Sequence, residues 1–257
     1  MTLIVTDAVV LHSLDYLESS RIFRLVTREA GVQSVLARGA RTSRKRFSNA
    51  LGLFAEGQAQ IQTKPGRELH TLLTFDVLKL RPALAADLGR FTAANALAEC
   101  VTRIVHEEAA HRVYRGVVEG LDLIANAASD RSVTTGLGVM WRLVGDVGFT
   151  PSLGACAECH TLIAPDADAM FSHLAGGALC SRCGAHSPGG RRLPAAARLA
   201  IAGWLHDDRA AAVSLSAGEA RAHQRLLREF LGQHLPDARA MKAFAVWEQG
   251  EWSNTPG

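Results

Sequence analysis

Alternation of apolar and polar residues with a period of two runs through the first 80 residues and predicts β-strands. Such runs occupy residues 5–11, 22–26, 32–37, 53–63 and 69–78, with turn residues between them. Gly57, inside the fourth run, is expected to form a bulge. Five short strands in a stretch of this length predict a small closed barrel, and five-stranded Greek-key barrels of this size are typically OB-folds. A generic five-stranded sheet is the alternative.

Beyond Pro82 the apolar residues recur at helical spacing instead. The segments with this spacing are residues 88–105, 113–124, 137–144, 194–205 and 216–234. The last of them opens with Ser216-Ala-Gly-Glu219, a capping box, and its Leu227, Phe230 and Leu231 are expected to face the core. We interpret these stripes as core-forming helix faces, because none of them contains a cofactor motif.

Two C-x-x-C pairs, Cys156–Cys159 and Cys180–Cys183, interrupt the helical pattern, and twenty residues separate them. This spacing is typical of a zinc site, because two such turns facing each other form a tetrahedral cage of four thiolates. Four cysteines complete the shell, so a metal held there is expected to be structural. Two disulfides or four free thiols are the alternatives. The fifth cysteine, Cys100, lies in an apolar helical stretch and is predicted to be ordinary core.

These patterns together predict an α+β multidomain protein with an N-terminal OB-fold β-barrel and an α-helical C-terminal domain that carries a four-cysteine zinc module. The barrel is assigned to residues 1–80. The helical domain takes residues 81–150 and 191–250, with the zinc-binding module inserted at 151–190. Residues 251–257 are expected to form a disordered tail.

Composition and cysteine spacing together favour a globular protein of a reducing compartment. Hydrophobic residues make up 48% and charged residues 21% of the 257 residues, as in ordinary globular proteins. No apolar run approaches the roughly 18 residues that cross a bilayer, and the N-terminus lacks the features of a signal peptide. Cysteines in metal spacing favour the cytoplasm. A cytoplasmic, nucleoid-associated protein is expected.

The excess positive charge lies at the N-terminal end. Residues 1–80 contain eleven Lys and Arg against seven Asp and Glu, whereas the rest of the chain is within one charge of neutral. The cations gather between the third and fourth strands, where no acid occurs from Ala30 to Ala55. This basic segment contains Arg38, Arg41, Arg44, Lys45 and Arg46 and ends at Phe47.

A basic loop on a barrel predicts nucleic-acid binding, because neutralised phosphates release counterions. The five cations are the expected phosphate ligands, and the ring of Phe47 is expected to stack on a base. A solvated run of charges is the alternative. A further arginine stripe, Arg221, Arg225 and Arg228, is more typical of a solvated helix face than of a ligand site.

Enzyme motifs are incomplete in this sequence. His106 and His111 are five residues apart, and the zinc-protease motif requires four so that both rings share a helix face. His106-Glu107-Glu108 fits the start of a nucleobase-deaminase motif, but neither C-x-x-C pair follows a proline. A P-loop and a G-x-S-x-G motif are also missing. We therefore expect a protein that is not an enzyme.

Several segments, taken in order along the chain, resemble the RecO family of bacterial DNA repair and recombination mediators. These segments are residues 6–11 with 18–23, 38–41 with 51–54, 148–153 before Cys156, and 234–235 with 241–242. Two positions depart from the family pattern. Arg38 stands where lysine is frequent, which keeps the charge, and Ala243 stands where the family tends to have serine, so no role is carried over to it.

The resemblance implies a non-enzymatic protein that binds single- and double-stranded DNA and anneals complementary strands. It further implies that the protein works with RecR and binds the acidic C-terminal tail of single-strand binding protein, so that RecA can be loaded. Candidate residues for that tail are Arg131 and Arg142, which form the weaker pair, and Arg221, Arg225 and Arg228 as the alternative. The alternative is a zinc-containing interaction adaptor with no direct role on DNA.

Overall fold

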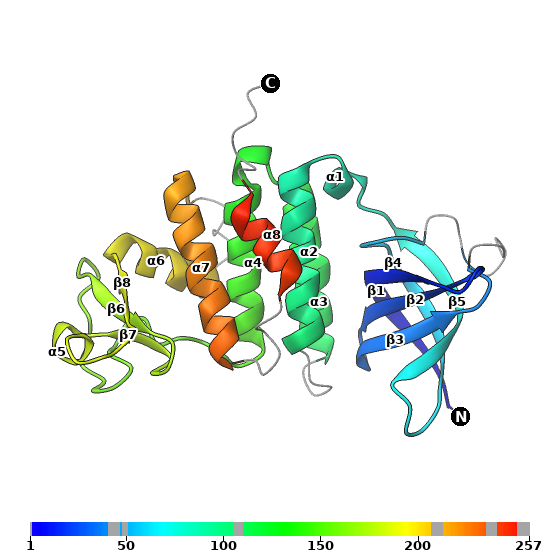
Figure 1. Ribbon diagram of the computed structural model, residues 1–257, viewed down its shortest axis with the longest axis horizontal. Helices are drawn as coiled ribbons and strands as arrows, with labels where there is room; N and C mark the ends of the chain where they lie inside the picture. Colours follow the sequence, from blue (N-terminus) through cyan, green and yellow to red (C-terminus); the bar gives the residue numbers. More distant parts are fainter. Residues whose placement is uncertain are drawn as a thin grey trace.

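The computed structural model describes residues 2–40, 47, 51–104, 110–206, 213–234 and 241–250. Within them a β-barrel lies at one end, a layer of helices in the middle, and a small sheet with the paired cysteines at the other end (Figure 1). The architecture is therefore α+β, with an N-terminal sheet and C-terminal helices. Among the described residues, no helix is long and apolar enough to cross a membrane.

Strands β1 to β5 close into a barrel with the order β1-β2-β3-β5-β4. They span Thr2–Tyr16, Ser20–Thr27, Gly31–Ala37, Glu56–Thr63 and Leu69–Lys79. Neighbours pair antiparallel except β3 and β5, which are parallel. The pairing of β4 with β5 shifts register at Gly57, as predicted for a bulge, and a Cβ on Gly57 would lie 2.1 Å from the carbonyl oxygen of Asp76.

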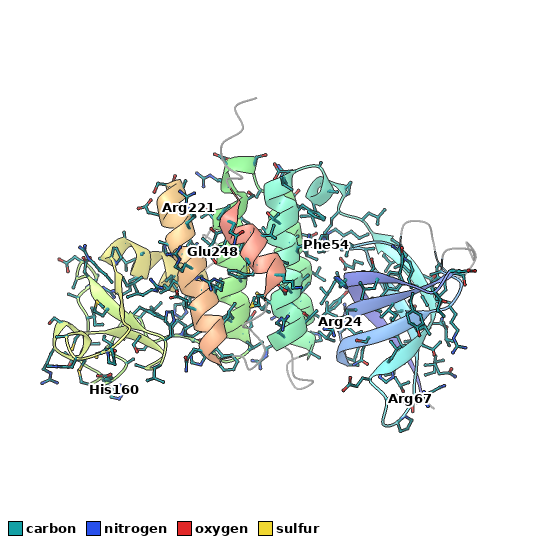
Figure 2. All side chains as sticks on the ribbon, viewed as in Figure 1. Arg24, Phe54, Arg67, His160, Arg221 and Glu248 are labelled. Carbon is teal, nitrogen blue, oxygen red and sulfur yellow. The ribbon has the colours of Figure 1, made fainter. Side chains whose placement is uncertain are left out.

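Strands β1 and β4 differ most from the sequence prediction, and β2 extends beyond its predicted range at both ends. Strand β1 is longer than predicted, because its first half pairs with β4 and its second half with β2. Strand β4 begins at Glu56, since the chain first turns at Phe54, whose φ is 62°. That turn sends the Phe54 ring out of the barrel and against Phe91 of the helical layer, with ring centroids 6.4 Å apart (Figure 2).

The helical layer follows the predicted stripes. Its helices are α1 Pro82–Ala85, α2 Leu88–Ile104, α3 Ala110–Asn126, α4 Ser132–Asp146 (after the short 3₁₀ turn Ser129–Arg131), α6 Ala195–His206, α7 Ala217–His234 and α8 Lys242–Gln249. The predicted stripes correspond to α2, α3, α4, α6 and α7, whereas α1 and α8 were not predicted by a stripe. Most of the apolar stripe positions are buried in one core and Trp141 of α4 is fully enclosed, but Leu88 at the start of α2 is 58% exposed. Cys100 is buried there as well, as predicted.

Helices α7 and α8 begin with side-chain caps. The Ser216 backbone N–H donates to Glu219 Oε2 at 2.8 Å, and the Glu219 N–H donates back to Ser216 Oγ at 3.3 Å, which confirms the predicted capping box. Helix α8 is capped from a distant segment: the N–H groups of Lys242 and Phe244 donate to the carboxylate of Glu99 on α2 at 2.9 and 3.0 Å. Leu227, Phe230 and Leu231 face the core as expected.

The cysteine module lies between α4 and α6 and packs beside α6 and α7 (Figure 1). Strands β6 Ala169–Ser172, β7 Gly177–Leu179 and β8 Arg191–Leu193 form a small antiparallel sheet in the order β7-β6-β8, and the short helix α5 spans Ser181–Gly184. Gly177 is required there, because a Cβ at that position would lie 2.3 Å from the carbonyl oxygen of Ser152.

Arg81 joins the barrel to the helices. Its side chain is 2% exposed and donates to Glu56 Oε2 of β4 at 2.6 Å, to Asp122 Oδ1 of α3 at 2.7 Å and to the carbonyl of Phe54 at 3.1 Å. Lys79 adds a second contact to Asp122 at 2.6 Å. These contacts fix the barrel against α3.

Candidate nucleic-acid interface and metal centre

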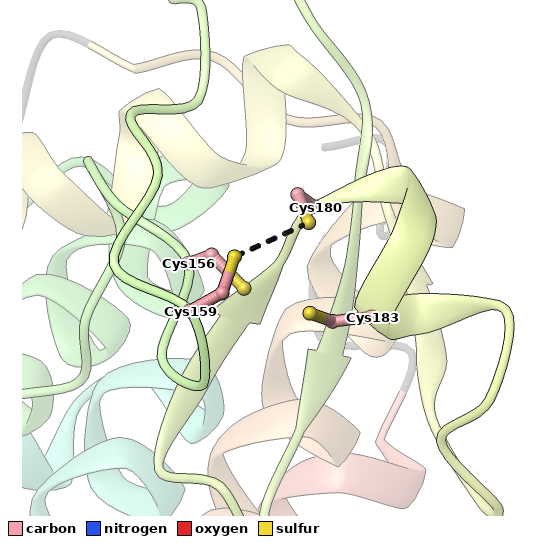
Figure 3. A group of neighbouring side chains, drawn as sticks. All are labelled: Cys156, Cys159, Cys180 and Cys183. Carbon is pink, nitrogen blue, oxygen red and sulfur yellow. Dashed lines mark hydrogen bonds between the residues drawn. The ribbon is translucent and has the colours of Figure 1, made fainter.

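The paired cysteines meet in space as their spacing predicts (Figure 3). All four sulfurs lie within 4.8 Å of one another, and Sγ of Cys159 lies 3.7 Å from Sγ of Cys180. A tetrahedral site with metal–sulfur bonds of about 2.3 Å has sulfur–sulfur edges of about 3.8 Å. The cysteines are free thiols rather than disulfides. The cluster therefore has the ligands and dimensions to hold a metal ion.

Backbone hydrogen bonds position the two cysteine pairs. The N–H of His160 donates to the carbonyl of Cys156 at 2.9 Å, and the N–H of Cys156 donates to the carbonyl of Thr161 at 2.8 Å. His160 adopts a φ of 60°, in the left-handed region, so the chain folds back over the first pair. On the second pair, Gly184 N–H donates to the carbonyl of Cys180 at 2.8 Å. Both pairs are thereby held on tight turns that face each other.

The thiols of the cluster differ in acidity. The pKa of Cys159 is lowered to about 5, because the hydroxyl and backbone N–H of Thr161 and the thiol of Cys156 stabilise its thiolate. The pKa of Cys183 is raised to about 12, by burial and by the neighbouring thiols of Cys159 and Cys180. The thiol protons of this compact group depend on one another. A divalent cation would replace them and bind the sulfurs as thiolates.

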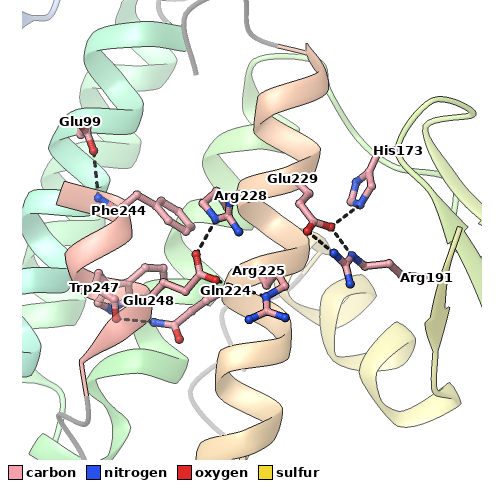
Figure 4. Close-up of polar contacts among 10 residues, drawn as sticks. All are labelled: Glu99, His173, Arg191, Gln224, Arg225, Arg228, Glu229, Phe244, Trp247 and Glu248. Atoms are coloured by element: carbon pink, nitrogen blue, oxygen red, sulfur yellow. Dashed lines mark hydrogen bonds and ion pairs between the residues drawn. The ribbon is translucent and has the colours of Figure 1, made fainter. Parts of the chain in front are cut away.

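Arg198 of α6 anchors the module to the helical layer. Its side chain is almost completely buried and donates to the carbonyl of Leu153 at 2.9 Å and to that of Ala164 at 2.5 Å. A second anchor is Glu229 of α7, which accepts from His173 at 3.1 Å and from Arg191 of β8 (Figure 4). Sequence reasoning did not predict these contacts, and an arginine within an otherwise apolar helix was the only signal for Arg198.

Of the predicted DNA-binding residues, the structure describes Arg38 and Phe47. Arg38 is exposed directly after β3. Arg41, Arg44, Lys45 and Arg46 lie outside the described residues, as do His106 and the predicted tail.

The base-stacking role predicted for Phe47 is wrong. Its side chain is 2% exposed, forms a bridge with Phe75 and belongs to the barrel core. A ring enclosed there cannot present its face to a base. The sequence placed this aromatic residue beside the cations but gave no sign that the chain re-enters the core at that point.

The arginine stripe on α7 is partly neutralised within the chain. Arg228 Nε lies 2.5 Å from Glu248 Oε2 of α8, and Arg225 Nε lies 3.6 Å from Oε1 of the same carboxylate (Figure 4). Arg221 is exposed one turn earlier on α7 (Figure 2). The stripe therefore serves to hold α8 as well as to face solvent.

Arg131 and Arg142 do not form a compact pair. Arg131 is exposed at the 3₁₀ turn before α4, and Arg142 is half-buried near the end of that helix. Eleven helical residues correspond to about 16 Å. One short acidic group cannot bind both.

Sequence reasoning also missed a pocket of about 410 Å³ between β8, α6 and α7. Its lining includes Arg191, Arg192, Arg225 and the buried His223. Burial lowers the pKa of His223 to about 4, so this ring is neutral at physiological pH. The adjacent arginines 191 and 192 are a local signal in the sequence, but the other residues come from a separate helix that only the fold brings close.

Comparison with known proteins decides the family. The model described as "Recombination protein O N terminal" matches residues 1–81, and "Recombination protein O C terminal" matches residues 85–242. The chain belongs to the RecO family. A protein named DNA repair protein RecO from Anaeromyxobacter sp. (strain K) is 34% identical over 241 residues, covering 92% of this chain and 93% of the relative. Another of that name, from a Nocardioides species, is 30% identical over 248 residues, covering 95% and 98%.

Proposed function

We propose that the chain acts in bacterial DNA repair as a recombination mediator that binds the DNA backbone through its N-terminal barrel. The relatives named DNA repair protein RecO support a role in DNA repair. The observation that carries the proposal is a closed barrel with strand order β1-β2-β3-β5-β4 whose third strand leads directly into the basic segment from Arg38 to Arg46. We assign this barrel to the OB-fold, which binds oligonucleotides on its second and third strands and the loops beside them.

The proposed activity is binding without catalysis. The chain would bind single- and double-stranded DNA, bring complementary strands together and act with RecR to load RecA onto strands covered by single-strand binding protein. Phosphate contacts carry no base sequence, which suits a protein that must act at any damaged site. A cytoplasmic, nucleoid-associated location follows from this role.

The acidic tail of single-strand binding protein is the proposed ligand of the helical layer. Arg221, Arg225 and Arg228 of α7 are the first set of candidate contacts, and Arg221 and Arg225 are exposed there. Arg225 and Arg228 hold Glu248, so a tail carboxylate at these two would have to compete with that residue. Arg131 and Arg142, which are far apart, are the second choice.

Zinc is the proposed metal of the cysteine cluster, in a structural role. Cys156, Cys159, Cys180 and Cys183 would supply four thiolate ligands, and such a closed shell leaves no position for a reacting water. The metal would hold the two turns together and so keep β7 and α5 against the helical layer.

Salt dependence of DNA affinity tests the proposed function. Each phosphate neutralised contributes about 0.7 to the slope of log K against log[salt] for a single strand, and about 0.9 for a duplex. If four or five cations of the basic segment contact phosphate, we expect slopes of about −3 to −3.5 for single strands. Fluorescence anisotropy with a labelled oligonucleotide measures this. An adaptor with no role on DNA would show no salt-dependent binding, and that result would contradict the proposal.

A further inference from the structure

The outer surface of β1, β2 and β3 carries an apolar row. Strand register places Leu14 opposite Ile22, and Ile22 opposite Leu36. Directly opposed residues of antiparallel strands point to the same face of the sheet. Phe23, which follows Ile22 on β2, and Val35, which precedes Leu36 on β3, are fully buried. Because successive side chains of a strand point to opposite faces, the row with Leu14 must point outward. It spans two inter-strand spacings, about 10 Å.

This row is exposed and ends beside an aromatic ring. Leu14 is 55% exposed and Tyr16 is 43% exposed, while Ile22 and Leu36 are half-buried. Tyr16 is two residues beyond Leu14 on β1 and therefore shares its face, about 7 Å along the strand. Apolar side chains at these positions of a small barrel contribute nothing to its core.

Cations lie on both sides of the apolar row. Arg24, two residues from Ile22, is exposed on the outer face of β2 (Figure 2). Arg38, two residues from Leu36, is exposed at the end of β3, toward the Tyr16 side. The nearest acid on these strands, Asp15, alternates to the opposite side of β1 from Tyr16 and forms an ion pair with Arg21 at 2.9 Å. The face therefore combines apolar contact area with flanking positive charge.

We infer that this face, formed by Leu14, Tyr16, Ile22 and Leu36 between Arg24 and Arg38, is where the bases of a single strand lie. The inference rests on the proposed function and adds the base-contact surface to it. An apolar row flanked by cations fits a chain whose flat apolar groups and phosphates alternate, and Tyr16 supplies the stacking ring that the buried Phe47 cannot. A duplex hides its base faces, so only unpaired strands can use this surface.

Tyr16→Ala in the full-length protein tests the inference when affinity is measured for two single strands of equal length, one with bases and one abasic. Stacking on one base contributes about 1–3 kcal/mol, which corresponds to about 5- to 150-fold in affinity. We expect the parent to prefer the strand with bases and the variant to lose that preference by this factor. The salt slope and duplex affinity should not change, because the phosphate contacts remain.

Leu14→Ala is a second variant of the same face, so the test does not depend on Tyr16→Ala alone. Leu3→Ala is its matched control. Both leucines lie on β1 and are about equally exposed, at 55% and 56%, but Leu3 pairs toward β4 instead of β2. Only Leu14→Ala should weaken binding of the strand with bases. Folding is checked by thermal unfolding.

Three outcomes would overturn the inference. The first is a parent-like preference for bases in Tyr16→Ala, which would place the bases elsewhere. The second is that Tyr16→Ala or Leu14→Ala sediments differently from the parent but binds DNA with the parent's affinity, which would make this face a contact between two copies of the chain. In both, DNA binding by the parent still supports the proposed function. The third is a parent that binds neither strand, and that result alone removes the proposed function as well.

Discussion

Cys156→Ser is expected to unfold residues 151–190 while the barrel stays folded. A structural zinc site contributes about 10–16 kcal/mol of apparent binding free energy, and removing one of its four thiolates weakens that contribution. The module's own buried cluster is small, with Ile163 and Leu179 as its largest side chains around Cys156. Its other support comes from the contacts of Arg198 and Glu229 with the helical layer. Hydrogen exchange followed by mass spectrometry would show protection lost in residues 151–190 and retained in residues 2–40.

Metal analysis accompanies this variant. The reduced, chelator-free parent should contain one equivalent of zinc per chain. Cys100→Ala is the matched control, because Cys100 is buried in α2, away from the cluster, and its loss should leave the zinc content unchanged. A parent with well under one equivalent of zinc, or a Cys156→Ser protein with the parent's exchange pattern, would contradict the metal assignment.

Arg81→Ala is expected to lower the free energy of unfolding by about 3 kcal/mol, at the lower end of the range for breaking a buried ion pair. The variant would leave Glu56 and Asp122 without their shared partner at the junction of barrel and helices. Those carboxylates are 21% and 30% exposed, so water offsets part of the loss. Arg115→Ala is the control, since Arg115 forms an exposed pair with Glu119 on α3, and about 0.5 kcal/mol is expected for it.

The effect of Arg81→Ala should depend on pH. Burial raises the pKa of Asp122, but hydrogen bonds from Lys79 and Arg81 outweigh burial and leave the pKa below its ordinary value. The stabilisation is therefore complete above about pH 4, the ordinary range, and is lost as pH falls through the lowered pKa. Urea unfolding of parent and variant should converge in acid. Equal losses for Arg81→Ala and Arg115→Ala at neutral pH would show that the junction does not depend on Arg81.

Local periodicity predicted most of the fold because each element buries one face. The period of two predicted the barrel strands, and the helical stripes around Trp141 and Phe230 predicted core helices that the structure confirms. Boundaries failed where tertiary contacts override the pattern. The apolar run that starts at Leu53 looks like strand, but Phe54 turns outward to pack on Phe91.

The candidate sites were also predictable only where local sequence determines them. The cysteine cluster was predictable because its ligands lie in two short motifs with fixed spacing. Phe47 was misjudged because its burial depends on Phe75, which is distant in sequence. The pairing of Arg228 with Glu248 likewise depends on how α8 returns across α7, which no local pattern specifies.

The most direct test of the account compares the salt dependence of DNA binding in two triple variants that remove equal charge. One replaces Arg44, Lys45 and Arg46 with Ala, and the other replaces Arg221, Arg225 and Arg228. The first should flatten the slope of log K against log[salt] by about 2 units for a single strand and about 2.7 for a duplex, if all three cations contact phosphate. The second should keep the parent's slope. An unchanged slope in the first variant with its fold intact, or a flattened slope in the second alone, would contradict DNA binding through the barrel.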